Sequence, residues 1–519
     1  MSEQPAAPAP LQPAAAPGPA AGGSAVPPQG GSAAPPQGGS AAPPQGGSAT
    51  PPQGGSAAPP QGGSAAPPQG GGELLRENIV AFAVAIVMAL VIKHFCLEAF
   101  RIPTSSMYPT LYGERDARPD GQEDRILVDK WAYLARDPAR GEVVVFQYPL
   151  DRSRNFIKRV AGLPGEWVRI QDGDVWVRRA EGDPWRPAQR PRAVRESLYR
   201  RAYPPAHPEE SWQGGSWWEA EEGREGWRLD SLSRLAYEGS APARLRYAAP
   251  LNVQGGLSCR DLRLCMRVIP RGRGELKLGW ATEGGWKGSL VLPIGEPDSE
   301  MGLSLAQQGG QAPEAQPLDV VLKPGRPTQL EWEVVDGAMH VWVDGVERAV
   351  RPFERTPGRG EGRQALTLEA SGAPLVLENL RIDTDLHYSI GSARFRTELG
   401  APQGVRVPDD AFLMLGDNTD YSSDSRAWEA GGVRLKDGQE VWWNLSGEQG
   451  TGPSRVAGTQ LNSCVDLDGI ERTWHDEEEQ ESLPHRWITF VPRDHVVGRA
   501  FVIFWPAWPA FPRRVGWIH

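Results

Sequence analysis

The longest apolar run in the chain lies near its N-terminal end. Residues 79–92 read IVAFAVAIVMALVI and contain no polar side chain. Extended to Leu97, the run predicts a helix about 28 Å long, close to the hydrocarbon thickness of a bilayer. Lys93 and His94 would lie near one end, where a long side chain reaches the headgroups. No comparable run follows, so the pattern predicts one transmembrane helix over residues 73–98.

Two alternatives to a span remain. A cleaved signal peptide is disfavoured because the bulky stretch KHFCLEAF follows the run, where a cleavage site needs small residues. A buried helix of a soluble domain stays open. Charge does not set the orientation, because Arg76 lies on one side of the run and Lys93 and Arg101 lie on the other.

Strand-type alternation dominates the middle of the chain. Residues 330–350 form three alternating runs joined by Asp336-Gly337 and Asp344-Gly345, which are strong hairpin signals. ALTLEA and PLVLENLRID continue the pattern. Residues 172–385 therefore resemble a concanavalin-like or laminin-G-like β-sandwich. Such a module either binds an unknown ligand or partner or is an inert embellishment, because a fold alone does not give a function.

The cysteines indicate neither a disulfide within this segment nor a metal site. Cys259 and Cys265 flank an alternating segment with Leu262 and Met266 on one face. On one strand the two thiols would lie about 20 Å apart, too far to bond. No C-x-x-C spacing occurs, so we expect no metal and no cofactor.

The first 72 residues repeat PPQGGSAA and contain almost no large apolar residue. Such a segment cannot bury enough surface to offset its ordering entropy, so a disordered tail is predicted. The chain has a net charge of -10, and no basic stripe stands out. A nucleic-acid partner is therefore not expected.

A hydroxyl-rich stretch follows the apolar run. FRIPTSSMYPTLYG, residues 100–113, holds Thr104, Ser105 and Ser106 between two prolines. This composition is most often that of a turn. A serine becomes a nucleophile only when a base removes its proton, and no histidine stands in a suggestive context. There is no G-x-S-x-G motif either.

Lysine is the other candidate base. In NFIKRVAGLPGEWV, strand alternation puts Lys158 on one face with Phe156 and Val160. Apolar neighbours desolvate the ammonium group and lower its pKa, which a base needs, because only about one ordinary lysine in a few thousand is neutral at pH 7. Lys130 also shares a face with apolar residues, so alternation does not separate the two. A surface role suits either lysine as well.

Five segments, in this order, resemble the characteristic boxes of type I signal peptidases (leader peptidases), Ser/Lys proteases of family S26. They are IPTSSMYPTL, RGEVVVFQYP, FIKRVAGLPGE, LGDNTDYSSDSRAW and VVGRAFVIFWP. The resemblance covers about a third of the chain. It implies a mainly β fold, with a signal-peptidase/LexA-like catalytic core after one N-terminal transmembrane helix.

The resemblance also implies roles for individual residues. Ser106 would be the nucleophile and Lys158 the base, and Ser422 would orient the lysine. The backbone N–H of Ser106 and the hydroxyl of Thr104 would hold the oxyanion. At position 104 the family more often has serine, and threonine keeps the donor while restricting χ1.

Further residues would support the site or line it. Asp424 and Arg426 match an ion pair that supports the loop carrying Ser422, and Asp417 matches a structural acid. Thr419 stands where the family often has arginine, and Ser105 stands where it often has glycine. Shallow apolar pockets would select small residues at the first and third positions before the cut. Their walls map to Phe100, Ile102, Met107, Phe156 and Ile157.

The expected organisation has seven segments. They are a tail (1–72), a transmembrane helix (73–98), three parts of a catalytic core (99–171, 386–428 and 487–519), the β-sandwich insert (172–385) and a second insertion (429–486).

The expected function is removal of signal peptides from preproteins after A-x-A type sites. The partners would be preproteins and the lipid bilayer of the plasma (inner) membrane, with the tail cytoplasmic and the catalytic domain extracytoplasmic. The alternative is a membrane-anchored binding protein with a relic protease core. The presence of Ser106, Lys158, Ser422 and Thr104 together favours the enzyme.

Overall fold

A computed structural model describes most of the chain. Residues 1–70 of the predicted tail, Lys93, His94 and Cys259 lie outside the described residues. The chain falls into two units that divide after Leu90, and each is described by itself. The described ranges are 71–91, 96–113, 123–205, 217–222, 226–249, 261–282, 285–296, 302–307, 315–355, 364–390, 397–446, 452–505 and 515–519.

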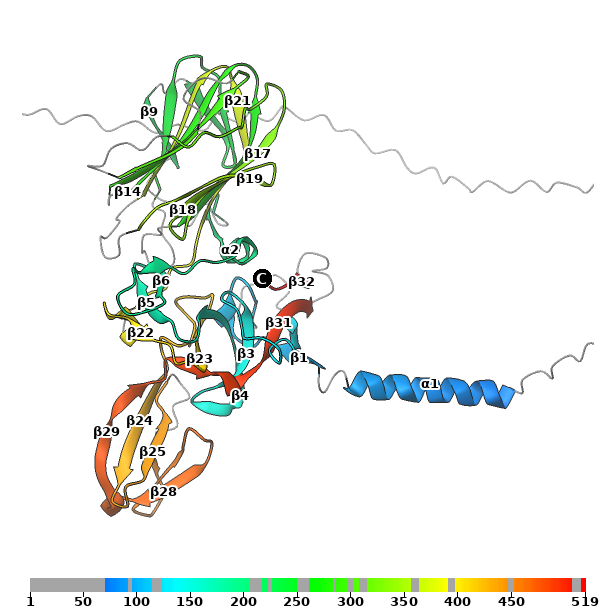
Figure 1. Ribbon diagram of the computed structural model, residues 1–519, viewed down its shortest axis with the longest axis vertical. Helices are drawn as coiled ribbons and strands as arrows, with labels where there is room; N and C mark the ends of the chain where they lie inside the picture. The colour runs from blue at the N-terminus through cyan, green and yellow to red at the C-terminus, as the bar shows by residue number, and fades with distance from the viewer. Residues whose placement is uncertain are drawn as a thin grey trace, which may run out of the picture. The chain divides into compact units, whose positions relative to one another are not determined.

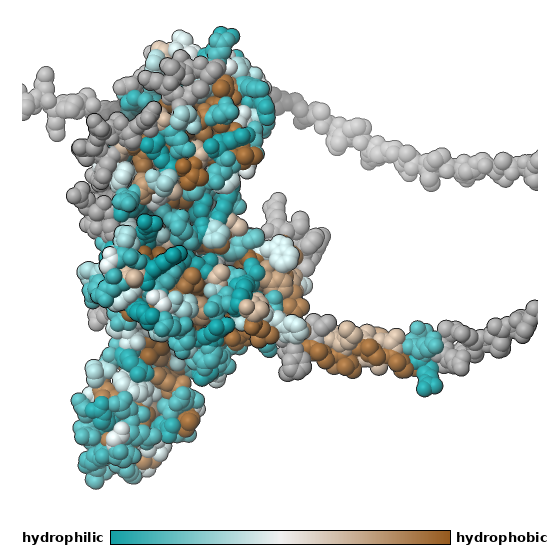
Figure 2. Space-filling view, viewed as in Figure 1, coloured by the Kyte–Doolittle hydropathy of each residue, from teal (hydrophilic) through white to brown (hydrophobic). Residues whose placement is uncertain are grey.

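Helix α1 (Gly71–Val91) contains most of the predicted apolar run. Apolar side chains gather along it (Figure 2). In the part of the chain that the structure describes, no helix combines the length and the apolarity needed to cross a membrane. The helix predicted to reach Leu97 differs from the structure, because Leu97 begins strand β1 and pairs with Asp129 of β2.

The predicted catalytic motifs lie on or beside one eight-stranded sheet (Figure 1). The strands run in the order β1-β2-β31-β3-β4-β23-β30, and β32 pairs with β31. Their alternate side chains fill two apolar clusters. The bounds are β1 (Leu97–Arg101), β2 (Arg125–Asp129), β3 (Val143–Tyr148), β4 (Asp151–Gly162), β23 (Ala411–Leu415), β30 (Phe490–Pro492), β31 (Val496–Trp505) and β32 (Gly516–Trp517).

A four-stranded sheet, ordered β22-β5-β6-β7, follows the lysine motif. β5 and β6 are joined through Asp172 and Gly173, both at positive φ, as a tight hairpin requires. β6 and β7 lie inside the predicted 172–385 insert, yet β6 pairs with β5 and β7 pairs with β6, so both strands belong to this sheet and not to the sandwich. The bounds are β5 (Trp167–Gln171), β6 (Asp174–Arg178), β7 (Arg186–Pro187), α2 (Arg192–Leu198), η5 (Glu398–Gly400) and β22 (Val405–Arg406).

Residues 200–384 form a two-layered β-sandwich, as predicted. One sheet runs β10-β11-β21-β13-β17-β18-β19, with β8 on β21, and the other runs β16-β15-β14-β20-β12-β9. One apolar core includes side chains of both sheets. The bounds are β8 (Arg200–Tyr203), β9 (Trp218–Glu222), β10 (Trp227–Ser231), β11 (Arg234–Tyr237), β12 (Ala243–Tyr247), β13 (Leu262–Pro270), β14 (Gly274–Thr282), β15 (Trp286–Ile294), β16 (Gly302–Gln307), β17 (Thr328–Val335), β18 (Ala338–Val343), β19 (Val346–Pro352), β20 (Gln364–Gly372) and β21 (Leu375–Thr384).

The sandwich confirms the local sequence signals. Asp336-Gly337 and Asp344-Gly345 join β17 to β18 and β18 to β19, with positive φ at all four residues. The predicted face of β13 is buried, while Cys265 on the same strand is a free thiol. The first and last strands are neighbours, because Arg200 of β8 is the register partner of Thr384 of β21. The chain therefore enters and leaves the sandwich at neighbouring positions.

Residues 429–487, one residue longer than the predicted second insertion, form a segment that we call the arm. It contains two three-stranded sheets, β25-β24-β29 and β26-β27-β28, which share a small core around Cys464 and Trp474 (Figure 1). The bounds are β24 (Glu429–Leu435), β25 (Glu440–Asn444), β26 (Ser454–Arg455), β27 (Leu461–Val465), β28 (Glu471–His475), η7 (Asp476–Glu478) and β29 (Glu479–Trp487); η8 (Arg493–His495) follows it. The described chain is mainly β, as predicted.

Candidate active site

The side chains of the predicted nucleophile, Ser106, and the predicted base, Lys158, are in contact. Ser106 lies on the short helix η2 (Ser105–Met107), just after β1, and Lys158 lies on β4 between β3 and β23. Lys158 Nζ donates a hydrogen bond of 2.7 Å to Ser106 Oγ and one of 2.9 Å to the carbonyl oxygen of Ile157. Both side chains belong to buried residues. The pair has the geometry that proton transfer from a serine requires.

Burial changes the pKa of Lys158. It lowers the pKa of Lys158 to about 8, although the carboxylates of Asp424 and Asp417 oppose the shift. The rival lysine differs, because Lys130 Nζ lies 3.3 Å from Glu98 and its side chain is 32% exposed. Lys158 is thus the lysine that is buried beside the serine.

The loop after β23 holds the serine box. Asn418 Nδ2 donates to the carbonyl oxygen of Ser105 at 2.9 Å, and the Asn418 backbone N–H donates to that of Ser106 at 3.1 Å. Sequence reasoning assigned Asn418 no role, although it is the asparagine of the G-D-N motif. Thr104 Oγ1 donates to Ser106 Oγ at 3.4 Å, so the proposed oxyanion donor lies beside the nucleophile.

Ser422 lies close to the serine box, and its backbone N–H donates to the carbonyl oxygen of Asn418 at 2.9 Å. Its hydroxyl is buried and has no partner in the structure, so the expected bond to Lys158 is not seen. Gly416 lies between the two segments: a Cβ there would stand 2.0 Å from Ser422 Oγ and 2.6 Å from the carbonyl oxygen of Ser106. The close approach therefore requires glycine at 416. The orienting role of Ser422 stays a prediction.

Asp424 and Arg426 form a fully buried, bidentate ion pair, with Nε–Oδ1 and Nη2–Oδ2 distances of 2.9 and 2.8 Å. Asp424 also accepts the Gly416 N–H, and Arg426 donates to the carbonyl oxygen of Thr419. Burial alone raises the pKa of Asp424, but Arg426 and these donors lower it below its ordinary value. The pair therefore fixes both ends of the loop that carries Ser422.

Asp417 has a partner that the sequence reasoning missed. Arg159 Nε and Nη2 lie 2.8 and 2.7 Å from its two carboxylate oxygens, and Thr110 Oγ1 donates to it at 2.5 Å. Arg159 follows Lys158, so alternation puts it on the other face of β4. Arg200, the first residue of the sandwich, donates to the Asp417 carbonyl oxygen at 2.7 Å. The sandwich thus contacts the loop of the G-D-N motif directly.

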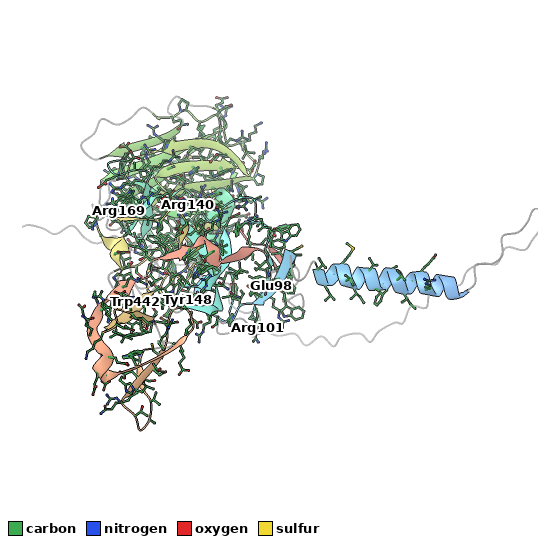
Figure 3. All side chains as sticks on the ribbon, turned by 60° about the horizontal axis from the view of Figure 1, so that its bottom comes forward. Glu98, Arg101, Arg140, Tyr148, Arg169 and Trp442 are labelled. Carbon is green, nitrogen blue, oxygen red and sulfur yellow. The ribbon has the colours of Figure 1, made fainter. Side chains whose placement is uncertain are left out.

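The predicted pocket walls divide between two apolar clusters. Phe100, Ile102, Met107 and Ile157 belong to one cluster. Phe156 packs on the other, which includes Tyr148 and Trp428. Figure 3 labels Tyr148 of this second cluster, and Trp442 of the arm, which packs against it. Apolar packing therefore connects the face of Lys158 with the arm.

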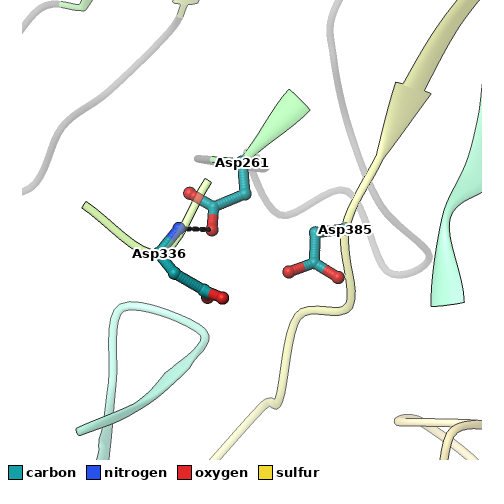
Figure 4. Close-up of side chains that lie close together, drawn as sticks. All are labelled: Asp261, Asp336 and Asp385. Carbon is teal, nitrogen blue, oxygen red and sulfur yellow. Dashed lines mark hydrogen bonds between the residues drawn. The ribbon is translucent and has the colours of Figure 1, made fainter. Parts of the chain in front are cut away.

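Three buried carboxylates meet at one end of the sandwich (Figure 4). Oxygens of Asp261, Asp336 and Asp385 lie within 4.8 Å of one another, an arrangement that could hold a cation. Arg190 pairs with Asp336 and Asp385, and Arg355 pairs with Asp261. Burial raises the pKa of Asp385 to about 6, although Arg190 opposes the rise. Two guanidinium groups already pair with all three carboxylates, so the cluster is an ion-pair network.

Comparison with known proteins gives one family. Residues 75–211 match the family model described as signal peptidase, peptidase S26. The chain is 43% identical over 98 residues to a probable signal peptidase I-2 of Synechocystis sp., covering 18% of this chain and 40% of the relative. It is 41% identical over 108 residues to signal peptidase I of Pseudomonas fluorescens, covering 18% and 35%. The chain spans less than half the length of these two relatives. The predicted resemblance to signal peptidase I is confirmed.

Among solved structures, the chain is similar to the carbohydrate-binding module CBM66 from Bacillus subtilis. The match covers 32% of this chain and 96% of that module, at 11% identity and a TM-score of 0.23. A score this low carries no argument about fold type or ligand. The concanavalin-like or laminin-G-like character of the sandwich stays a prediction.

Proposed function

We propose that this chain is a membrane-anchored serine endopeptidase that removes signal peptides from exported preproteins. The observation that carries the proposal is the 2.7 Å hydrogen bond between Lys158 Nζ and Ser106 Oγ, both buried, in a segment similar to signal peptidase I. A relic core would need neither this pairing nor the lowered lysine pKa.

The chemistry follows from the pair. Neutral Lys158 takes the proton of Ser106 as Oγ attacks the scissile carbonyl carbon, and the resulting ammonium gives that proton to the leaving amine as the C–N bond breaks. Water then attacks the acyl ester while Lys158 accepts its proton, and the ammonium returns this proton to Ser106 Oγ as the ester C–O bond breaks, which releases the new carboxyl terminus. The backbone N–H of Ser106 and the Thr104 hydroxyl would hold the oxyanion in both steps.

Specificity would come from the apolar walls around the dyad. Ile102 and Met107 are buried, and Phe100 and Ile157 pack against the same cluster. Walls of this kind exclude bulky side chains more sharply than they reward small ones. Cleavage after small residues at the first and third positions follows, as at A-x-A sites.

The apolar run of α1 would anchor the enzyme. Its side chains are exposed on several faces: Ile79 is 59% exposed, Phe82 70% and Val84 53%. A helix that is apolar all round is stable where its surroundings are apolar, as in a bilayer. The anchor would keep Ser106 at the membrane surface, where signal peptides present their cleavage sites. The catalytic domain would face the extracytoplasmic side of the plasma membrane.

Cleavage of a preprotein tests the proposal. The full chain in detergent or liposomes should cut a preprotein with an A-x-A site, and mass spectrometry should find the new N-terminus after the second alanine. Ser106→Ala and Lys158→Met should each abolish the cut. Cleavage that survives Ser106→Ala, or a wild-type chain that cuts no such preprotein, would refute the proposal.

A further inference from the structure

Phe156 links the dyad to a stack of aromatic rings. Lys158 Nζ lies 5.3 Å from the centre of its ring. The Phe156 ring is also parallel to the Tyr148 ring, with centroids 4.2 Å apart and planes 3° apart. Trp428 packs edge-on against both rings, at 5.4 Å from Tyr148 and 6.1 Å from Phe156. The position of a predicted pocket wall therefore depends on Tyr148 and Trp428.

Residues of the arm contact Tyr148, the ring of this stack that lies beyond Phe156. The side chains of Ser446 and Asn444, at the end of β25, are hydrogen-bonded to the hydroxyl oxygen of the buried Tyr148. These two residues are themselves fixed, because the Ser446 N–H donates to Asn444 Oδ1 at 2.8 Å and the Glu429 N–H donates to Ser446 Oγ at 2.6 Å. A chain of contacts thus runs from the base of the arm through Tyr148 to the Phe156 ring.

Apolar contacts follow the same route. Ala430 of β24 is buried in the cluster that contains Tyr148, and Trp442 and Leu467 of the arm pack against it. The Arg486 guanidinium lies 4.5 Å from the centre of the Trp442 ring and covers it. The base of the arm is therefore part of the packing that supports Phe156.

We propose that the arm is a specificity element of this peptidase. Asn444 and Ser446 position Tyr148, and Tyr148 holds Phe156 as a fixed wall of the substrate pocket. A pocket that excludes bulky substrate side chains needs rigid walls, because a Phe156 ring that can shift would admit a larger side chain. Tyr148, Asn444 and Ser446 are positioning residues, and the inference rests on the proposed function.

Peptide cleavage tests the inference. Tyr148→Phe removes the hydroxyl and keeps the ring. The ratio of kcat/KM for an Ala-x-Ala peptide to that for peptides with Leu at the first or third position should fall at least about threefold. The kcat for Ala-x-Ala should stay within about twofold of the wild type. Asn444→Ala combined with Ser446→Ala should lower the ratio equally, and adding Tyr148→Phe should change it little further.

The controls separate the possible failures. Arg455→Ala, in an exposed ion pair of the arm with Asp476, should leave the ratio unchanged. An equal effect of Tyr148→Phe on all peptides would mean a merely structural role, and an unchanged ratio in both sets of variants would also overturn the inference. In both cases the proposed function stands. A wild-type chain that cleaves none of the peptides would overturn the proposed function and the inference together.

Discussion

Lys158 Nζ donates to Ser106 Oγ at 2.7 Å across 52 residues of sequence. β4 supplies the lysine from the interior of a sheet, and η2 supplies the serine from the end of β1. Neither side chain faces bulk water, so the surroundings set the charge of the amine. The first two predictions follow from this relationship.

Replacing Lys158 should separate activity from stability. The fall of its pKa from 10.5 to about 8 means that the buried ammonium costs about 3 kcal/mol at neutral pH, because the unfolded chain binds its proton more tightly. Lys158→Met should therefore abolish cleavage and leave the melting temperature equal or higher. Lys130→Met, at a half-buried lysine beside Glu98, should keep activity. Clear destabilisation by Lys158→Met would show a structural lysine.

The pH profile should report the same group. The neutral amine is the base, so kcat/KM should rise about tenfold per pH unit below pH 8 and level off above it. Stability should also rise between pH 8 and about 10.4, because there only the unfolded lysine is protonated. Peptide cleavage and circular dichroism from pH 5 to pH 10 measure both. A flat kcat/KM from pH 6 to pH 9 would contradict a lysine base.

Thr104 should act only in the transition state. Its hydroxyl lies 3.4 Å from Ser106 Oγ, within reach of the proposed oxyanion. Thr104→Val keeps the shape and removes the donor, so kcat should fall by on the order of 10²–10³ with little change in KM. Thr104→Ser is the matched control and should stay active. Near wild-type turnover in the valine variant would place the donor elsewhere.

The sandwich should be separable from the catalytic core. Arg200 and Thr384 are register partners, so a short Gly/Ser linker can replace residues 201–383 and keep the Arg200 contact to Asp417. The shortened enzyme should cleave an Ala-x-Ala peptide within about tenfold of the parent, about 1.4 kcal/mol in the barrier. Slower cleavage of full-length preproteins alone would indicate docking by the sandwich. A folded but inactive product would mean that the sandwich contributes to the site.

Local signals in the sequence predicted local structure well. Asp336-Gly337 and Asp344-Gly345 mark tight turns because each needs two residues at positive φ, and the turns lie where expected. The motif order identified Ser106 and Lys158, and the structure brings the two side chains together. Alternation alone did not separate Lys158 from Lys130, because both share a strand face with apolar residues and only the tertiary neighbours differ.

Non-local pairing was harder to predict. β6 has the same alternation as the sandwich strands, yet it pairs with β5, and β22 completes that sheet from more than 200 residues away. Arg159 gave no signal of its own, because its partner Asp417 is 258 positions further along the chain. The pairing of Phe156 with Tyr148 across β3 and β4 was likewise invisible, since alternation shows which face a side chain takes and not which ring it meets.

The neighbouring ends of the sandwich also bear on how this protein folds. Lys158 and Asp417 belong to one site, but the chain between them includes the whole sandwich. If the sandwich forms first, the pairing of Arg200 with Thr384 shortens the loop that must close to bring the two parts of the site together. The pairing cuts this loop to about a third of its length, which lowers the entropic cost of closing it by about 1 kcal/mol. The large insertion therefore adds little to the entropic cost of bringing Lys158 and Asp417 together during folding.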